Sequence, residues 1–225
     1  MLQYSGCDGT ATREMPLSSL RARQKEDRRN RILASAKTLF GQSGYERTTI
    51  DAIAEAAGVS GVTVHNYYGT KAGILLALGI ENDAALIERL ENTLPDPPED
   101  LTRLVLDFAG IVMDHAIGNL DKVIWRQVIA AVTTGGVTRL TSAYFDLDRQ
   151  LAQVLVRRIE GLQRAGRLPA AIDATHLGKA LFHLQNARFI QFISSDEVTH
   201  AEIEHRLGND LMALFAVGAA GGAPH

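Results

Sequence analysis

The amino-acid sequence predicts an all-helical protein of about nine helices: a three-helix head that contains a helix-turn-helix, followed by a larger helical body. Two observations predict this fold class. Apolar residues recur at spacings of three and four along the chain, and no stretch shows the strict apolar/polar alternation of a half-buried strand. Gly and Pro clusters, such as Pro-Asp-Pro-Pro at 95–98, separate the periodic segments.

The predicted helices follow one another with short connections. From the caps and periodicity we expect helices at 26–43, 49–57, 60–67, 70–93, 101–116, 121–132, 138–165, 174–194 and 199–217. The longest apolar run, residues 74–80, is far short of the roughly 20 residues that a membrane span needs. No secretory signal is recognisable, and Cys7, the single cysteine, can form no internal disulfide, which suits a reducing compartment. We therefore expect a cytoplasmic protein.

The charge is distributed unevenly. The net charge is −3, but residues 1–75 carry 10 Lys and Arg against 7 Asp and Glu, whereas residues 76–225 carry 13 against 19. A basic head on an acidic body is typical of a nucleic-acid-binding protein. Basic residues are densest in one stretch: Arg21, Arg23, Lys25, Arg28, Arg29, Arg31 and Lys37. We interpret part of this stretch as a phosphate or minor-groove contact; the alternative is a solvated helix start.

Residues 48–71 read as two short helices on a tight turn, followed at once by a third. Thr49 is a good N-cap for the first helix, and Gly58 stops it because Gly adopts the left-handed conformation without steric cost. Ser60 then caps the second helix. This arrangement predicts a helix-turn-helix.

The second helix sorts its residues by face. Val64 and Tyr68 fall together and face the first helix, whereas the opposite side at its N-terminal end is largely polar. That outward side consists of Gly61, Val62, Thr63, His65 and Asn66. Such a face is typical of a recognition helix in the major groove. Thr70 and Lys71 open the next helix, where free amides and an ammonium favour a phosphate.

At these residues the chain resembles the tetracycline-repressor (TetR) family of transcription regulators. The matching elements are Thr-Thr-Ile-x-x-Ile-Ala from 48, Ala-Gly-Val-Ser from 57, Thr-Val-x-x-Tyr-Tyr from 63, and Lys71. The resemblance implies that Thr49, Tyr67 and Lys71 contact phosphates and that the outward residues of the second helix face bases. We expect Ser60, at the start of that helix, to belong to the same DNA-binding surface. The chain departs from the family pattern at Val62 and His65.

With this resemblance, the chain divides into four parts. We expect a flexible arm at 1–24, the DNA-binding head at 25–85, an effector-binding and dimerisation body at 86–217, and a flexible tail at 218–225. The helix at 70–93 would link head and body as a rigid lever. The two last helices carry more apolar surface than one side of a helix needs, which predicts a four-helix dimer bundle; burial inside one subunit is the alternative.

A regulator of this family implies a small-molecule effector bound between the central helices. The candidate pocket residues are Phe108, Val112, His115, Trp125, Val128, Tyr144, Phe182, Gln185, Asn186 and Phe189. The same residues also suit a packed core with a few satisfied polar groups. The partners that we expect are a palindromic double-stranded operator, an effector and a second copy of the chain, with no cofactor.

Other functional classes find little support in the sequence. It contains none of the nucleophile-elbow, zinc-protease, phosphate-loop or dinucleotide motifs of enzymes, and Asp146 and Asp148 stand on different faces of one predicted helix. The pairs His176/His183 and His200/His205 lack metal-ligand spacing. We expect a repressor that its effector releases from DNA. The alternatives are a regulator without a small-molecule site and a helical enzyme or carrier with a vestigial head.

Overall fold

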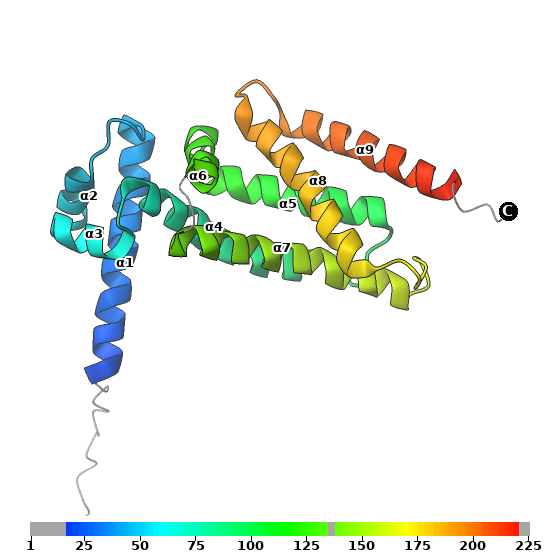
Figure 1. The fold of residues 1–225 in the computed structure, drawn as a ribbon, viewed down its shortest axis with the longest axis horizontal. Coiled ribbons are helices and arrows are strands. Elements are labelled where there is room, and N and C mark those ends of the chain that lie inside the picture. Colours follow the sequence, from blue (N-terminus) through cyan, green and yellow to red (C-terminus); the bar gives the residue numbers. More distant parts are fainter. Residues whose placement is uncertain (1–16, 135–137, 221–225) are drawn as a thin grey trace, which may run out of the picture.

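A computed structural model describes residues 17–134 and 138–220, and within these ranges the chain forms nine α-helices and no strand. The all-helical prediction is confirmed. The helices are α1 (Leu17–Ser43), α2 (Ile50–Ala57), α3 (Gly61–Tyr68), α4 (Lys71–Thr93), α5 (Leu101–Asn119), α6 (Lys122–Thr134), α7 (Arg139–Arg164), α8 (Ala174–Ser194) and α9 (His200–Ala220). Figure 1 shows α1 to α3 as a head at one end, α5 to α9 as the body, and α4 running between them.

Helix α1 begins earlier than predicted, at Leu17, so residues 17–24 belong to a helix and not to a flexible arm. The sequence prediction relied on an apolar stripe, and residues 20–24 are all exposed and have none. Figure 1 shows this end of α1 extending away from the other helices. The Leu, Arg, Gln and Lys residues of these first turns are good helix formers without such a stripe. At the other end α9 extends to Ala220, into the predicted tail; residues 1–16 and 221–225 lie outside the described ranges.

The head is held by one small apolar core. Ile32 and Phe40 of α1, Ile53 of α2 and Val64 of α3 are all buried against one another. The caps form as predicted: the Thr49 hydroxyl accepts a hydrogen bond from the amide of Ala52, and Gly58 ends α2 with φ +64°. The turn that follows fixes where α3 begins.

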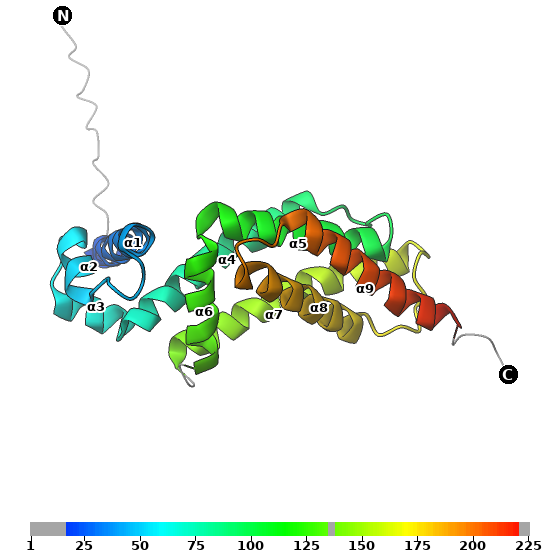
Figure 2. The same ribbon diagram turned by 90° about the horizontal axis from the view of Figure 1, so that it is seen from above.

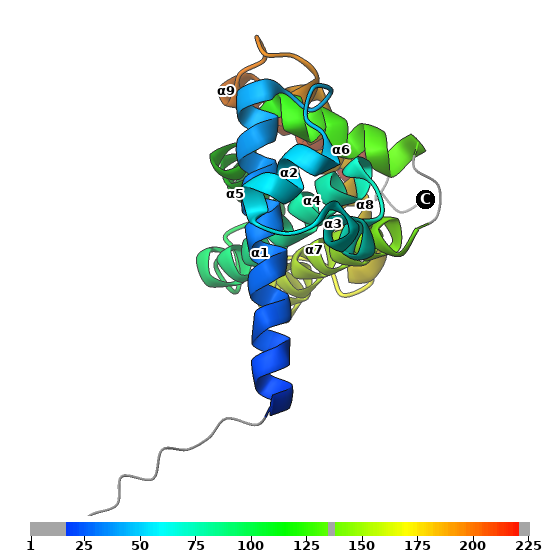
Figure 3. The ribbon, with the colours of Figure 1, turned by 90° about the vertical axis from the view of Figure 1, so that its left-hand side faces the viewer.

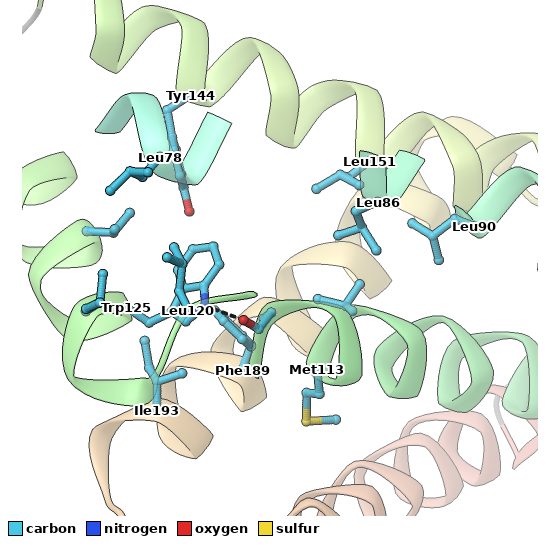
Figure 4. Packing of buried hydrophobic residues seen from close by; sticks show 14 of the residues in the cluster. Leu78, Leu86, Leu90, Met113, Leu120, Trp125, Tyr144, Leu151, Phe189 and Ile193 are labelled. Carbon is cyan, nitrogen blue, oxygen red and sulfur yellow. Dashed lines mark hydrogen bonds between the residues drawn. The ribbon is translucent and has the colours of Figure 1, made fainter. Parts of the chain in front are cut away.

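The body is a layered bundle around aromatic side chains. Trp125 of α6 packs edge-to-face on Phe189 of α8, with ring centroids 5.4 Å apart. Figure 4 shows Trp125, Tyr144 and Phe189 approaching one another from α6, α7 and α8. Helices α7 and α8 come unusually close, because a Cβ on Gly178 would lie 2.7 Å from Val156 Cγ2. In Figure 2, α9 lies alongside α8 and α5 at the outer side of this bundle.

Helix α4 contributes buried apolar residues to both the head and the body. Ile74 and Leu75 are buried on the side of the head, and Leu86 and Leu90 are buried in the body. At its C-terminal end, the Glu91 carboxylate accepts hydrogen bonds from Arg157 and Arg158 of α7. None of the described helices is both long and apolar enough to span a membrane.

The left-handed turn at Gly58 gives a stability prediction. Gly58→Ala should lower the free energy of unfolding by about 1 to 2 kcal/mol, because a Cβ is strained at positive φ. Gly41→Ala, within exposed α1 with open space around its Cα, is the matched control and should raise that free energy by about 0.5 to 1 kcal/mol. Urea unfolding measures both; equal effects would contradict the role of the turn.

Candidate nucleic-acid interface and central cavity

Helix α3 presents a polar face to solvent. Val64 and Tyr68 are buried in the core of the head, whereas the Val62 side chain is 70% exposed and His65 and Asn66 are exposed beside it. The orientation therefore matches the one expected for a recognition helix. Contact of these residues with bases stays a prediction, as does the same role for Gly61 and Thr63, which lie half-buried at the start of α3.

The start of α3 is fixed by its own side chains. The Ser60 hydroxyl accepts a hydrogen bond from the Thr63 amide at 3.1 Å and lies 2.8 Å from the Thr63 hydroxyl. Two side chains at the tip of the helix therefore have defined positions before any partner binds. This preorganisation reduces the conformational entropy that an interface would lose.

Lys71 has structural partners that the sequence did not reveal. Its ammonium donates hydrogen bonds to the carbonyl oxygens of Tyr45 at 2.7 Å and Glu46 at 3.2 Å, and it lies 4.2 Å from the centroid of the Tyr45 ring. These contacts tie the α1–α2 loop to the start of α4. An ammonium has three N–H donors, and these contacts use two of them. The phosphate contact expected of Lys71 would use the third and stays a prediction.

The basic stretch of α1 lies next to α3. The Tyr67 hydroxyl donates to the Lys25 carbonyl and the Tyr68 hydroxyl to the Arg29 carbonyl, each at 3.4 Å. Figure 3 shows α1 passing behind α2 and α3 and continuing beyond them. Arg31 is used internally, because it donates to the Ala57 carbonyl at 3.1 Å and pairs with Asp27. Lys25 remains exposed beside the recognition helix.

The body contains a small cavity of about 30 Å³ between four of its helices and α4. The lining residues are Leu86, Val112, Ala116, Trp125, Tyr144, Asp148, Leu151, Phe182, Gln185, Asn186 and Phe189. Seven of the ten residues predicted from the sequence are among them. Phe108 and Val128 are instead fully packed in the core. His115 faces a second hollow of about 190 Å³ near Lys37 of α1 and Glu81 of α4.

The sequence did not identify Asp148 as a cavity residue, although Tyr144, Asp148 and Leu151 share one face of α7 at helical spacing. Burial raises the pKa of the Asp148 carboxyl to about 6. Among the described residues it has neither a hydrogen-bond partner nor an ion pair. An acidic side chain kept without a cation in a cavity wall is a candidate for a binding group.

Two further polar groups define the chemistry of the cavity. Gln185 is 2% exposed, and its Oε1 accepts no hydrogen bond from the described part of the chain. The Trp125 Nε1–H, in contrast, is already used, because it donates to the Ala116 carbonyl at 3.0 Å (Figure 4). Gln185 Oε1 and the Asp148 carboxyl are thus two acceptors of the cavity wall that have no donor among the described residues.

Three of the histidines that the sequence singled out have other polar partners in the structure. His176 pairs with Asp173 at 3.0 Å, and His200 pairs with Asp114 at 3.3 Å. His205 lies 3.2 Å from the Asn209 amide. No group of three His, Cys, Asp or Glu side chains within the described ranges is arranged to hold a metal ion. The contacts of His176, His200 and His205 lie at the start of α8, between α9 and α5, and within α9, respectively.

Comparison with known proteins extends the geometric evidence. Residues 32–78 match the model of the family described as bacterial regulatory proteins, tetR family. The chain is 26% identical over 185 residues to the HTH-type transcriptional activator FasR of Mycolicibacterium smegmatis, over 78% of this chain and 80% of that one. It is 27% identical over 109 residues to the fatty acid metabolism regulator protein of Bacillus subtilis; this match covers 47% of this chain and only 56% of that protein.

Solved structures show the same fold across both parts of the chain. The TetR-family repressor FadR of Thermus thermophilus, crystallised in complex with lauroyl-CoA, superimposes with a TM-score of 0.62 at 24% identity. The superposition covers 83% of this chain and 93% of FadR. The similarity thus includes the head and the body.

The partly buried carboxyl of Asp148 gives a prediction with a defined pH dependence. The folded chain binds this proton more tightly than the unfolded chain, in which the pKa is near 3.8. Ionised Asp148 therefore lowers stability above about pH 6. Asp148→Asn should raise the free energy of unfolding by about 1 to 3 kcal/mol at pH 8, and most of the difference should disappear by pH 4.

Urea unfolding at pH 8 and pH 4 measures this effect. The matched control is Asp146→Asn, two residues away on the exposed side of α7 and paired with Arg149. It should change stability by less than about 0.5 kcal/mol at either pH. A gain in Asp148→Asn that is equal at both pH values would show that packing, and not the charge, is responsible.

Proposed function

Because the chain belongs to the TetR family, whose members are DNA-binding transcriptional regulators and not enzymes, we propose that it is a repressor released from its operator by a small molecule. It binds a palindromic operator as a homodimer and leaves it when the effector enters the body. The observation that carries the proposal is the polar face of α3, held outward by the buried Val64 and Tyr68.

The exposed residues of α3 have the chemistry of base readout. Asn66 can form two hydrogen bonds with the edge of an adenine, His65 can donate to an acceptor, and the Val62 methyls can contact a thymine methyl. The exposed Thr49 can donate its hydroxyl proton to a phosphate, and the Tyr67 phenol can do so if it exchanges its 3.4 Å hydrogen bond to the Lys25 carbonyl for one to DNA. These contacts would make binding both sequence-dependent and salt-dependent.

Helices α8 and α9 have the apolar surface that a dimer needs. Met212 and Leu214 of α9 and Ile190 of α8 are large apolar side chains exposed to solvent. The buried residues of α9, such as Leu207 and Leu211, face the subunit's own core. A second copy that covers the exposed side would form a four-helix bundle and would present two α3 helices to successive major grooves.

Coupling between the cavity and the head runs through α4. Its Leu86 is part of the cavity wall, and its first residue, Lys71, holds the α1–α2 loop of the head. A ligand that displaces Leu86 would therefore shift the helix that supports the head. Release requires that the ligand prefer the conformation that fits the operator less well.

One observation favours a second candidate, a regulator of the same family without a small-molecule site. The cavity of about 30 Å³ holds one or two water molecules, whereas ligand pockets measure roughly 300 to 1,000 Å³. If no compound stabilises the protein in a thermal-shift screen while operator binding is retained, this second function replaces the first.

Selection of bound sequences from random duplex DNA at a stated salt concentration tests the DNA-binding part directly. We expect two inverted half-sites whose centres are about one helical turn apart or a multiple of it. A selected pool without symmetry would exclude the proposed dimer on a palindrome. A reporter gene placed downstream of the selected site then separates repression from activation.

The assigned contacts of α3 and α4 predict different responses to substitution. Asn66→Ala should reduce the preference for the operator over random DNA by about 1 to 3 kcal/mol and leave the salt dependence unchanged. Lys71→Ala should weaken binding to all sequences and lower the salt slope by about one. Fluorescence anisotropy at several salt concentrations measures both quantities.

The structural role of Lys71 is controlled by Lys71→Arg. This variant keeps the positive charge and should retain the salt slope, even where the contact with the α1–α2 loop is altered. Equal effects of Asn66→Ala and Lys71→Ala on operator and random DNA would contradict the assigned roles.

The exposed face of α9 predicts a dimer-breaking substitution. Leu214→Glu should convert the dimer to a monomer and abolish high-affinity operator binding, because a charge would be buried between the copies. Leu214 is 55% exposed in the single chain, so the fold itself should tolerate the change. Val123→Glu, at a 48% exposed position of α6, is the matched control and should stay dimeric. Light scattering after size exclusion measures the mass of each variant.

A further inference from the structure

Besides Tyr144 and Asn186, the wall of the central cavity contains two groups that accept hydrogen bonds and have no donor within the described residues. Gln185 offers a buried Oε1 without a donor, and Asp148 offers a carboxyl without a cation. The one indole N–H in the wall is already bonded to a backbone carbonyl. A buried acceptor left without a donor destabilises the folded chain, so a ligand that supplies donors would recover free energy here.

The charges around the cavity exclude one class of ligand. No Lys, Arg or His side chain is among its lining residues. The carboxylate or phosphate of an anionic ligand would therefore enter without a counter-charge and close to Asp148. A plain hydrocarbon chain would avoid that repulsion, but it would leave both acceptors unsatisfied.

The apolar walls suit a cation. Trp125, Phe182 and Phe189 contribute aromatic rings from α6 and α8, and Tyr144 contributes a fourth from α7. The face of an aromatic ring attracts a positive charge, more strongly where water is excluded. The aromatic rings and the two acceptors of the cavity wall would therefore both favour a ligand with a positive charge and N–H donors.

We propose that the effector is a compact apolar amine, whose protonated nitrogen donates hydrogen bonds to Asp148 and Gln185 while its apolar part lies among the aromatic rings. This inference rests on the proposed effector function and names its ligand class. The cavity must widen to admit such a molecule, and Leu86 of α4 is one of the walls that would move. The ligand would then bind preferentially to the conformation in which the cavity is widened.

Three matched probes test the charge preference: 2-phenylethylamine, 2-phenylethanol and phenylacetate, which share one ring and differ in the terminal group. Calorimetry and thermal shift with the full chain at pH 7.5 should show binding of the amine at least about tenfold tighter than binding of the carboxylate. Lauroyl-CoA, the ligand of the Thermus thermophilus structure, is the fourth probe.

Two substitutions in the cavity wall and one control on the surface test whether the probes bind in the cavity. Asp148→Asn should reduce amine affinity about tenfold and change alcohol affinity far less, because it removes the charge and keeps the shape. Asp146→Asn, on the exposed side of the same helix, should leave all affinities unchanged. Gln185→Met should weaken the amine and the alcohol together, because both lose one acceptor.

Tighter binding of phenylacetate or lauroyl-CoA than of the amine would overturn the inference, as would an Asp148→Asn variant with wild-type amine affinity. Binding of none of the four probes would also overturn it and would assign the two acceptors to bound water. Operator anisotropy tests the proposed function separately. If the amine binds but the operator affinity is unchanged, the ligand class stands and the effector role fails.

Discussion

The constraint on which the structure depends is that a single helix, α4, is covered by the head along its first half and by the body along its second half. Its first half packs under α1 and α3 through Ile74 and Leu75, and its second half packs on the body through Leu86 and Leu90. A helix buried at both ends cannot shift at one end without repacking at the other, because interiors are close-packed. The head and the body are therefore mechanically joined through one continuous apolar cluster, and this junction gives the cavity a route to α3.

Two charged residues of α7, the buried Arg158 and the partly buried Asp148, have different surroundings. Arg158 is buried but paired: its guanidinium reaches the Glu91 carboxylate at 3.1 Å and Asp96 at 3.7 Å, and so fixes the end of α4. Asp148, about three turns earlier, has no such partner. The ion pairs of Arg158 offset part of the cost of desolvating its guanidinium, whereas a partly buried carboxyl without a cation lowers stability when it ionises. The folded protein tolerates this loss at a position that lines the cavity.

The sequence was most informative where local chemistry decides the structure. Thr49, Gly58 and Ser60 form the caps and the turn that their residue types favour, and the inward placement of Val64 and Tyr68 follows from helical spacing alone. It was least informative where the partner is distant in the chain. Lys71 bonds carbonyls 25 and 26 residues away, and the solvated first turns of α1 have no apolar stripe to reveal them. Phe108 and Val128 share the helical face of true cavity residues but are covered by neighbours that periodicity cannot place.

The small size of the cavity bears on the direction of regulation. In the closed body the aromatic side chains fill most of the space between α6, α7 and α8, and the head is held in one arrangement by α4. A ligand larger than one or two water molecules can bind only to a body whose helices have separated. The closed body is then the form without ligand. Widening its cavity displaces the lining residues, which include Leu86 of α4. If the closed form is the one that fits the operator, ligand binding and DNA binding compete through the position of α4, and their coupling free energy is the same whichever partner binds first.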